Sequence, residues 1–152
     1  MAGFYGTYEN KVDAKGRVSV PAVFRQILAG PAFAAFPSHR MEAIEGFSVD
    51  FMDHLSARVS EIDFFSETQD DLSMTVFADS QNLSFDSTGR VQLPEGFRSH
   101  AGITDRAAFV GLGPTFQIWE PERLARHKAE ARQRARDKRL TIPAPGSGGG
   151  GR

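Results

Sequence analysis

The feature that most constrains the fold of this chain is an internal repeat. Residues 13–25 align without gaps on residues 86–98, at an offset of 73 residues, and seven of the thirteen aligned positions are identical. Both copies fit the pattern D-x-x-G-R-V-x-[VL]-P-x-x-F-R. Because a repeated sequence indicates a repeated structural unit, we expect two related halves arranged about a pseudo-two-fold axis.

Each copy is typical of a strand, a tight turn, a second strand and a short helix. In the first copy, residues 7–12 contain β-formers, residues 13–16 have turn chemistry, and residues 17–20 alternate polar and apolar side chains. This order predicts a local β-hairpin. Pro21 ends the strand and suits the first turn of a helix. The second copy repeats the scheme from Phe85 onward.

The rest of each half predicts further strands and one helix. We expect strands at residues 32–36, 44–49, 107–111 and 115–119, and helices at residues 50–62 and 121–139. The acidic segment 63–71 is expected to be a loop or linker. The predicted organisation is a first repeat at 4–62, a linker at 63–76, a second repeat with its C-terminal helix at 77–140, and a disordered tail at 141–152.

Composition restricts the setting in which the chain works. It contains no cysteine, so packing or assembly, rather than disulfides, must stabilise it. No stretch approaches the roughly 20 apolar residues of a membrane-spanning helix, and no signal peptide precedes the first repeat. We therefore expect a cytoplasmic protein without a membrane partner.

The net charge of −1 hides an uneven distribution. Residues 120–152 hold nine basic and four acidic residues, a net of +5, whereas the preceding residues hold nine basic and fifteen acidic ones, a net of −6. Such asymmetry permits a contact with nucleic acid. On composition alone it fits a solvated helix face as well.

Catalytic and metal-binding signatures are not found in the sequence. The four histidines are His39, His54, His100 and His127, and no two of them have metal-ligand spacing. Nucleophile-elbow, phosphate-loop and dinucleotide-binding patterns are also missing. We therefore expect no enzyme activity, no cofactor, no metal and no small-molecule substrate.

The repeated Asp-x-x-Gly-Arg turn is the one constellation with specific chemistry. Asp13 or Asp86 can accept hydrogen bonds from the turn backbone or from the arginine four residues later. Arg17 and Arg90 then begin the second strand, where a guanidinium held in place can meet phosphate or a guanine edge. An ion pair that only tightens the turn is the alternative, and the residues alone leave both open.

Other residues add to the candidate interface. Lys11 and Lys15 belong to the first turn region, and Arg25 and Arg98 follow the two prolines. Thr88 stands where the first copy has Lys15, so the first copy is expected to make the stronger phosphate contact. Phe24 and Phe97 are expected in the core rather than as base-stacking platforms. The candidate DNA-binding residues are Lys11, Asp13, Lys15, Arg17, Arg25, Asp86, Thr88, Arg90 and Arg98.

These motifs resemble the MraZ family and, more distantly, the AbrB-like DNA-binding fold. The opening segment at 6–17, the segment 110–113 and the following Phe116-Gln117-Ile118-Trp119 are similar to family signatures, and the family's D-x-x-x-R motif falls on Asp13 and Arg17 and on Asp86 and Arg90. The resemblance covers residues from Phe4 to about Ala135. The arginine-rich helix and the Gly-rich tail are expected to extend past the family core.

The resemblance implies a mainly β fold with helices, in which two pseudo-two-fold related swapped-hairpin halves form a β-barrel. It implies a homo-oligomeric ring of about eight or more subunits that binds repeated G-rich boxes in promoter DNA. It further implies a nucleoid-associated regulator, most simply a repressor, of the division and cell-wall gene cluster that includes its own gene. Two alternatives stay open, a ring-forming scaffold without DNA binding and an antitoxin-like module.

Overall fold

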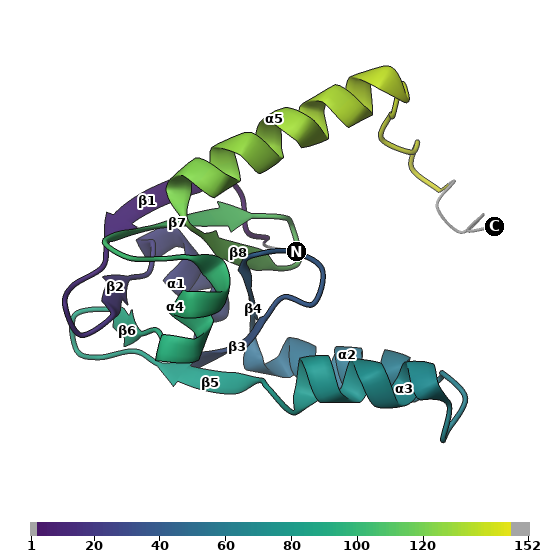
Figure 1. The fold of residues 1–152 in the computed structure, drawn as a ribbon, viewed down its shortest axis with the longest axis horizontal. Coiled ribbons are helices and arrows are strands. Elements are labelled where there is room, and N and C mark those ends of the chain that lie inside the picture. The colour runs from purple at the N-terminus through teal and green to yellow at the C-terminus, as the bar shows by residue number, and fades with distance from the viewer. Residues whose placement is uncertain (1–2, 147–152) are drawn as a thin grey trace. The chain divides into compact units, whose positions relative to one another are not determined.

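The computed structural model describes residues 3–146, and the chain divides into two compact units, residues 1–121 and 122–152. The strands are β1 (Thr7–Lys11), β2 (Arg17–Ser19), β3 (Ala32–Pro37), β4 (Ile44–Phe47), β5 (Gln81–Ser84), β6 (Arg90–Gln92), β7 (Arg106–Gly111) and β8 (Phe116–Trp119) (Figure 1). The helices are α1 (Ala22–Leu28), α2 (Val49–Val59), α3 (Glu67–Leu72), the π-helix η1 (Ser73–Phe77), α4 (Glu95–Ala101) and α5 (Pro121–Asp137). The strands and long helices expected outside the repeats are thus confirmed within a few residues.

The strand order reflects the internal repeat. One antiparallel sheet has the order β1-β7-β8-β4-β3-β5, and β2 pairs with β6 in a separate two-stranded antiparallel ribbon. If every strand is replaced by its equivalent in the other half (β1 by β5, β2 by β6, β3 by β7, β4 by β8, and the reverse), the same two strand orders result, read from the opposite end. Equivalent residues face each other at both centres, Glu45 of β4 opposite Gln117 of β8 and Val18 opposite Val91. A pseudo-two-fold axis therefore passes through both sheets, as the repeat predicts.

The local hairpin predicted for each copy is wrong in its pairing. The turn after β1 forms, but β1 pairs along its whole length with β7, and only a single bridge, Val12 to Val18, joins the two arms of the turn. The second arm, β2, pairs instead with β6 of the other copy. Each half thus completes the other. The expected closed barrel does not appear either, because within residues 3–146 no ladder joins the ribbon to the six-stranded sheet or joins the edges of that sheet.

The main core lies where the halves meet. Val18 and Val91 of the ribbon are 1% exposed, and Phe24 of α1 and Phe97 of α4 are buried with them in one cluster. Phe24 and Phe97 are therefore core residues, as predicted. Since the two central valines come from different copies, neither copy can bury its ribbon strand alone.

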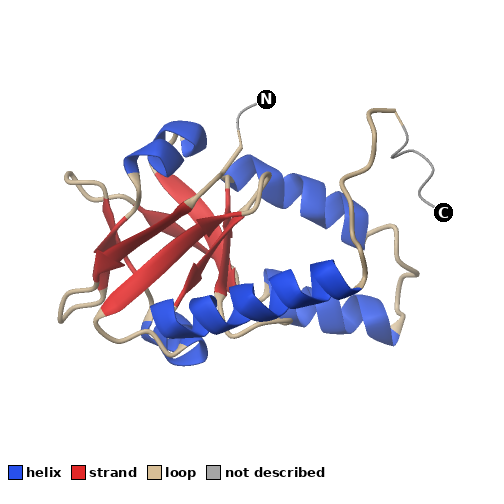
Figure 2. Cartoon of the chain, turned by 90° about the horizontal axis from the view of Figure 1, so that it is seen from above, coloured by secondary structure: helices blue, strands red, loops and turns tan. Residues whose placement is uncertain are grey.

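A smaller core underlies the segment expected to be a linker. Instead of a loop, residues 63–77 contain α3 and η1, and α3 begins where the Ser66 Oγ accepts a hydrogen bond of 3.1 Å from the Gln69 amide. Serine is a preferred N-cap residue. We predicted a loop here because acidic residues surround Ser66. Val76 of η1 is buried in a cluster with β3, β4 and α2. Figure 2 shows the helices in blue and the strands in red.

The second unit contains α5, which ends at Asp137, two residues before the predicted end. Residues 140–144 have neither helix nor strand, and a turn occupies 145–146. The predicted disorder of the tail concerns residues 147–152 as well, and these lie outside the described residues. No helix within residues 3–146 is long and apolar enough to cross a membrane.

Candidate nucleic-acid interface

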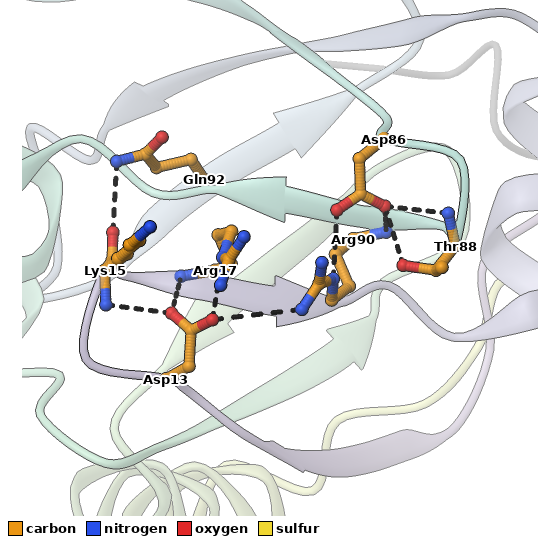
Figure 3. Close-up of polar contacts among 7 residues, drawn as sticks. All are labelled: Asp13, Lys15, Arg17, Asp86, Thr88, Arg90 and Gln92. Atoms are coloured by element: carbon orange, nitrogen blue, oxygen red, sulfur yellow. Dashed lines mark hydrogen bonds and ion pairs between the residues drawn. The ribbon is translucent and has the colours of Figure 1, made fainter.

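The β2–β6 ribbon brings the two repeated turns into one site. Because the strands are antiparallel, the turn that precedes β2 and the turn that precedes β6 sit at opposite ends of a ribbon only three residues long. Arg17 pairs with Gln92 and Ser19 with Arg90. Two motifs that are 73 residues apart in sequence are therefore neighbours in the fold (Figure 3).

Asp13 braces the first turn. Its Oδ1 accepts hydrogen bonds of 2.9 Å from the backbone amides of Lys15 and Arg17, and its Oδ2 accepts one of 2.7 Å from Arg17 Nε. The backbone also closes on itself, since the Gly16 amide donates to the Asp13 carbonyl at 2.9 Å. One carboxylate thus fixes both the bend and the start of the arginine side chain that follows it.

Asp86 braces the second turn in the same way. Its Oδ1 accepts from the amides of Thr88 and Arg90, both at 2.9 Å, and its Oδ2 accepts from Arg90 Nε at 2.9 Å. The Thr88 hydroxyl adds a hydrogen bond of 2.8 Å to Oδ1. The position that carries a free cation in the first copy, Lys15, thus carries a turn-bracing hydroxyl in the second.

Contacts across the ribbon tie the two turns together. Arg90 Nη1 lies 3.9 Å from Asp13 Oδ2, and Gln92 Nε2 donates to the Lys15 carbonyl at 3.0 Å (Figure 3). Nothing in the sequence distinguishes Gln92, because the contact joins residues 77 positions apart. Only the pairing of β2 with β6 creates it.

The arginines after the prolines reach the opposite turn. Arg25 Nε donates to the Val20 carbonyl and Arg98 Nε to the Leu93 carbonyl, both at 3.1 Å. A Cβ placed on Gly16 would lie 2.8 Å from Arg98 Cζ, and one on Gly89 would lie 2.7 Å from Arg25 Cζ. Each glycine also has a positive φ, 84° and 80°.

Two independent requirements therefore select glycine at Gly16 and Gly89: a left-handed backbone conformation, and room for a guanidinium supplied by the other copy. The first requirement is visible in the sequence as turn chemistry. The second depends on the crossing of the two halves and is visible only in the structure.

Both turn arginines are accessible. The side chains of Arg17 and Arg90 are 36% and 35% exposed. Their Nε atoms are committed to Asp13 and Asp86, so the turn-tightening ion pair is present. A guanidinium has five N–H donors, however, and the Nε hydrogen bonds leave the Nη donors of these partly exposed side chains, apart from the 3.9 Å approach of Arg90 Nη1 to Asp13. Bracing the turn and presenting an anion-binding fork are therefore compatible roles.

The remaining candidates differ in how closely they join the site. Lys15 is exposed on the first turn, and Arg25 and Arg98 are partly buried beside the glycines. Lys11 is exposed at the end of β1, where it pairs with Arg106 of β7, and no contact places it on the turn. Among the nine candidates, six are cations and two are carboxylates, so the set is strongly basic although the whole chain is not. No cluster of metal-ligating side chains occurs within residues 3–146.

Hydrogen bonds keep both aspartates ionised. The backbone amide of Arg17 is the main cause that lowers the pKa of Asp13, and the backbone amide of Arg90 does the same for Asp86. Desolvation opposes these effects, and the hydrogen bonds from the side chains of Arg17, Thr88 and Arg90 reinforce them. For Asp86 the pKa lies far below its ordinary value of 3.8. Both carboxylates thus carry full charge at neutral pH.

These lowered pKa values predict how stability depends on pH. A carboxyl group whose pKa is lower in the folded chain stabilises the fold above its unfolded pKa, and this stabilisation is lost as the pH falls toward the folded pKa. We expect the free energy of unfolding to drop below about pH 4. The drop should be smaller in Asp13→Asn/Asp86→Asn, measured by urea unfolding at several pH values between 6 and 2.5. Parallel curves for the two proteins would contradict this origin.

Comparison with known proteins supports the family resemblance that these motifs indicate. Residues 76–143 match the family model described as "MraZ protein, putative antitoxin-like". This match includes all of α5, so the expectation that the arginine-rich helix extends past the family core is wrong. A protein of Gluconacetobacter diazotrophicus named "Transcriptional regulator MraZ" is 43% identical over 157 residues, covering 99% of this chain and 98% of the relative.

Two further relatives carry the same name. A protein of the same name from Gluconobacter oxydans is 43% identical, covering 97% of this chain and 96% of its own length. A third, from Parvibaculum lavamentivorans, is 39% identical over the full length of both chains. The name describes transcriptional regulation, which is not an enzyme class. With both turn motifs in place and similarity along nearly its whole length, the chain belongs to the MraZ family of transcriptional regulators.

Proposed function

We propose that this protein regulates transcription by binding promoter DNA through the β2–β6 ribbon, with Arg17 and Arg90 as the main sequence-reading side chains. The observation that carries the proposal is the paired arrangement of two aspartate-braced arginines, each about one third exposed, on one short ribbon. Lys15, Arg25 and Arg98 supply additional positive charge for the DNA backbone.

Preorganisation is what makes this ribbon suitable. Arginine loses side-chain entropy when it binds, and less is lost when the guanidinium is already held. Asp13 and Asp86 hold the Nε atoms at 2.7 Å and 2.9 Å, which leaves the outer nitrogens for a guanine edge or a phosphate. In this arrangement Asp13, Asp86 and Thr88 act on DNA through the arginines and the turn backbone.

We further propose that subunits assemble into a ring of about eight or more copies, which engages repeated G-rich boxes. Each ribbon offers few base contacts, and several tethered copies raise the effective concentration of the next contact. A groove of about 680 Å³ between the α1 region and α2 supports an assembly role, since Phe4, Ile27 and Phe51 line it with other side chains. Tyr5, beside Phe4, is 68% exposed.

The relatives' name supports the regulatory role. For the target we propose the division and cell-wall gene cluster that includes the protein's own gene, and repression as the mode of control, with the protein in the cytoplasm on the nucleoid. These parts of the proposal rest on the resemblance to the family. Catalysis and a bound cofactor are not part of the proposal.

Removing both guanidinium groups tests the function. We expect Arg17→Ala/Arg90→Ala to weaken binding to a fragment of the protein's own upstream region by about 2 to 6 kcal/mol, because each bidentate base contact contributes about 1 to 3 kcal/mol. Arg17→Lys/Arg90→Lys keeps the charge but not the fork, so it should lose sequence preference and retain non-specific binding. Affinity is measured by fluorescence anisotropy at two salt concentrations.

The control is Arg40→Gln, which removes the charge of an exposed arginine between β3 and β4, a residue that belongs neither to the ribbon nor to the lining of the groove. It should bind DNA as the unmodified protein does. Unchanged affinity of the double alanine variant, with its fold verified by circular dichroism, would refute the assignment. A protein that forms large assemblies and retains no DNA would instead point to a scaffold.

A further inference from the structure

The outer face of the β2–β6 ribbon carries four polar side chains. Val18 and Val91, at the centre of the ribbon, are 1% exposed and point into the core. Successive side chains of a strand point to opposite faces. The neighbours of the two valines therefore share the outer face, and they are Arg17, Ser19, Arg90 and Gln92. Across the ribbon they form two pairs, because Arg17 lies opposite Gln92 and Ser19 opposite Arg90.

These two pairs are equivalent by position but differ in chemistry. Ser19 and Gln92 are 73 residues apart, the offset of the internal repeat, and both are exposed. A serine offers one hydroxyl group, whereas a glutamine offers a planar amide with two N–H donors and a carbonyl acceptor. One turn arginine, Arg17, thus has an amide beside it, and the other, Arg90, has a hydroxyl.

The backbone pairing of the ribbon does not account for this glutamine. At the end that carries Ser19, the Val20 amide donates to the Gly89 carbonyl at 3.1 Å. At the end that carries Gln92, the Leu93 amide donates to the Gly16 carbonyl at 2.9 Å. The two ends therefore close in the same way, one with a serine and the other with a glutamine on the outer face.

The amide of Gln92 is held in place and keeps groups for a ligand. Its Nε2 donates to the Lys15 carbonyl at 3.0 Å (Figure 3). This bond uses one N–H, and the amide has a second N–H and the Oε1 acceptor. A side chain that is already held loses less conformational entropy when it binds. Gln92 thus resembles the two turn arginines, whose Nε atoms are held by the aspartates.

The pair of Arg17 and Gln92 matches the base edges of the DNA major groove. That groove admits a two-stranded β-ribbon, and in it an arginine fork suits guanine while a glutamine amide suits the N6 donor and N7 acceptor of adenine. Residues directly opposite on antiparallel strands have Cβ atoms about 4.5 to 5.5 Å apart, and successive nucleotides along one strand are about 3.4 Å apart. The two side chains can therefore contact neighbouring base pairs.

We propose that Gln92 reads an adenine beside the guanine that Arg17 reads, so that the DNA site is asymmetric although the ribbon is pseudo-symmetric. The inference rests on the proposed DNA-binding function and adds a specificity-determining residue to it. At the other end, the Ser19 hydroxyl both donates and accepts, so it does not distinguish adenine from the other bases. The position beside the guanine read by Arg90 then lacks this preference.

The test compares base preferences of full-length variants. Each protein selects from a library of duplexes with a randomised centre, and sequencing gives the preferred base at each position. Fluorescence anisotropy then gives the affinity for the selected duplex and for its single base-pair replacements. The variants are Gln92→Ala, Gln92→Glu and Ser19→Gln, and Arg17→Ala identifies the guanine that Arg17 reads. The matched control is Gln26→Ala, which removes an exposed amide from α1, outside the ribbon.

We expect the unmodified protein to prefer adenine beside that guanine by about 5-fold to 150-fold, the range for one bidentate contact. Gln92→Ala should lose this preference and keep the others. Gln92→Glu should turn it toward cytosine, whose amino group donates to a carboxylate. Ser19→Gln should add an adenine preference beside the guanine that Arg90 reads. Gln26→Ala should leave every preference unchanged.

A purely structural role of Gln92 gives a different result. If the amide only holds the turn through Lys15, Gln92→Ala weakens binding to all duplexes by the same factor, and the inference is overturned. An unchanged base profile overturns it too. If sequence preference depends on Arg17 and Arg90 while Gln92→Ala changes nothing, only this inference fails. If the unmodified protein retains no DNA, the proposed function fails with it.

Discussion

Replacing Phe24 by alanine is expected to lower the free energy of unfolding by about 3 to 5 kcal/mol, the range for a large buried aromatic residue. The Phe24 side chain is 0% exposed at the centre of the main core. Its ring centroid lies 5.2 Å from that of Phe4 and 5.3 Å from that of Phe116. Tyr8 and Phe109 complete the ring contacts at 5.6 Å and 6.5 Å. Truncation removes these contacts and leaves a cavity that the surrounding strands cannot close.

The pseudo-symmetry of the chain provides a control. Phe97 occupies the equivalent position and is 4% exposed, but no aromatic ring contact involves it within residues 3–146. Aromatic pairs contribute about 0.5 to 1.5 kcal/mol beyond the burial of their surface. Phe97→Ala should therefore cost less than Phe24→Ala by at least about 1 kcal/mol. Urea unfolding at one fixed protomer concentration measures both, and equal losses would contradict the role given to the aromatic cluster.

Gln117→Leu is expected to lower the free energy of unfolding by about 2 to 4 kcal/mol, because it leaves a buried carboxylate with fewer donors. Glu45 is 7% exposed, and Gln117 Nε2 donates to its two carboxylate oxygens at 3.1 Å and 3.2 Å. The Ser38 hydroxyl donates to Glu45 at 2.7 Å, and Arg40 approaches it at 3.3 Å. Gln117 also accepts a hydrogen bond of 2.8 Å from Trp119 Nε1.

A double-mutant cycle isolates this contact. Removing one member of a buried polar pair leaves the other unsatisfied, whereas removing both is far less costly. We expect Glu45→Leu/Gln117→Leu to be destabilised by clearly less than the sum of the two single variants. Additive losses, measured by urea unfolding at pH 7, would show that Gln117 does not satisfy the carboxylate.

The sequence predicted the local chemistry of the candidate site well. The Asp-x-x-Gly-Arg spacing predicted a turn in which the aspartate holds the backbone and the arginine, and Asp13 and Asp86 do both. This was possible because every partner lies within four residues along the chain. Membership of the MraZ family was predicted from the same motifs and is confirmed by the relatives.

Contacts between the two copies were not predictable in this way. The crossing of Arg25 onto Gly89 and of Arg98 onto Gly16 depends on which strand pairs with which. The burial of Glu45 could not be predicted for the same reason. Its hydrogen-bond partner, Gln117, lies on β8, and only the pairing of β4 with β8 brings the two residues together. The helix α3 was missed for a local reason: an acidic stretch hid the capping serine, Ser66.

The sequence by itself determined that this chain consists of two copies of one turn-strand-helix unit, because turn chemistry, β-propensity and helix starts act over a few residues. Only the tertiary structure decided that β2 pairs with β6 rather than with β1. The physical reason is burial: Val18 and Val91 lose their exposure to water only when they face each other at the pseudo-two-fold axis. That pairing also brings the two arginines together, so the candidate interface belongs to both halves at once.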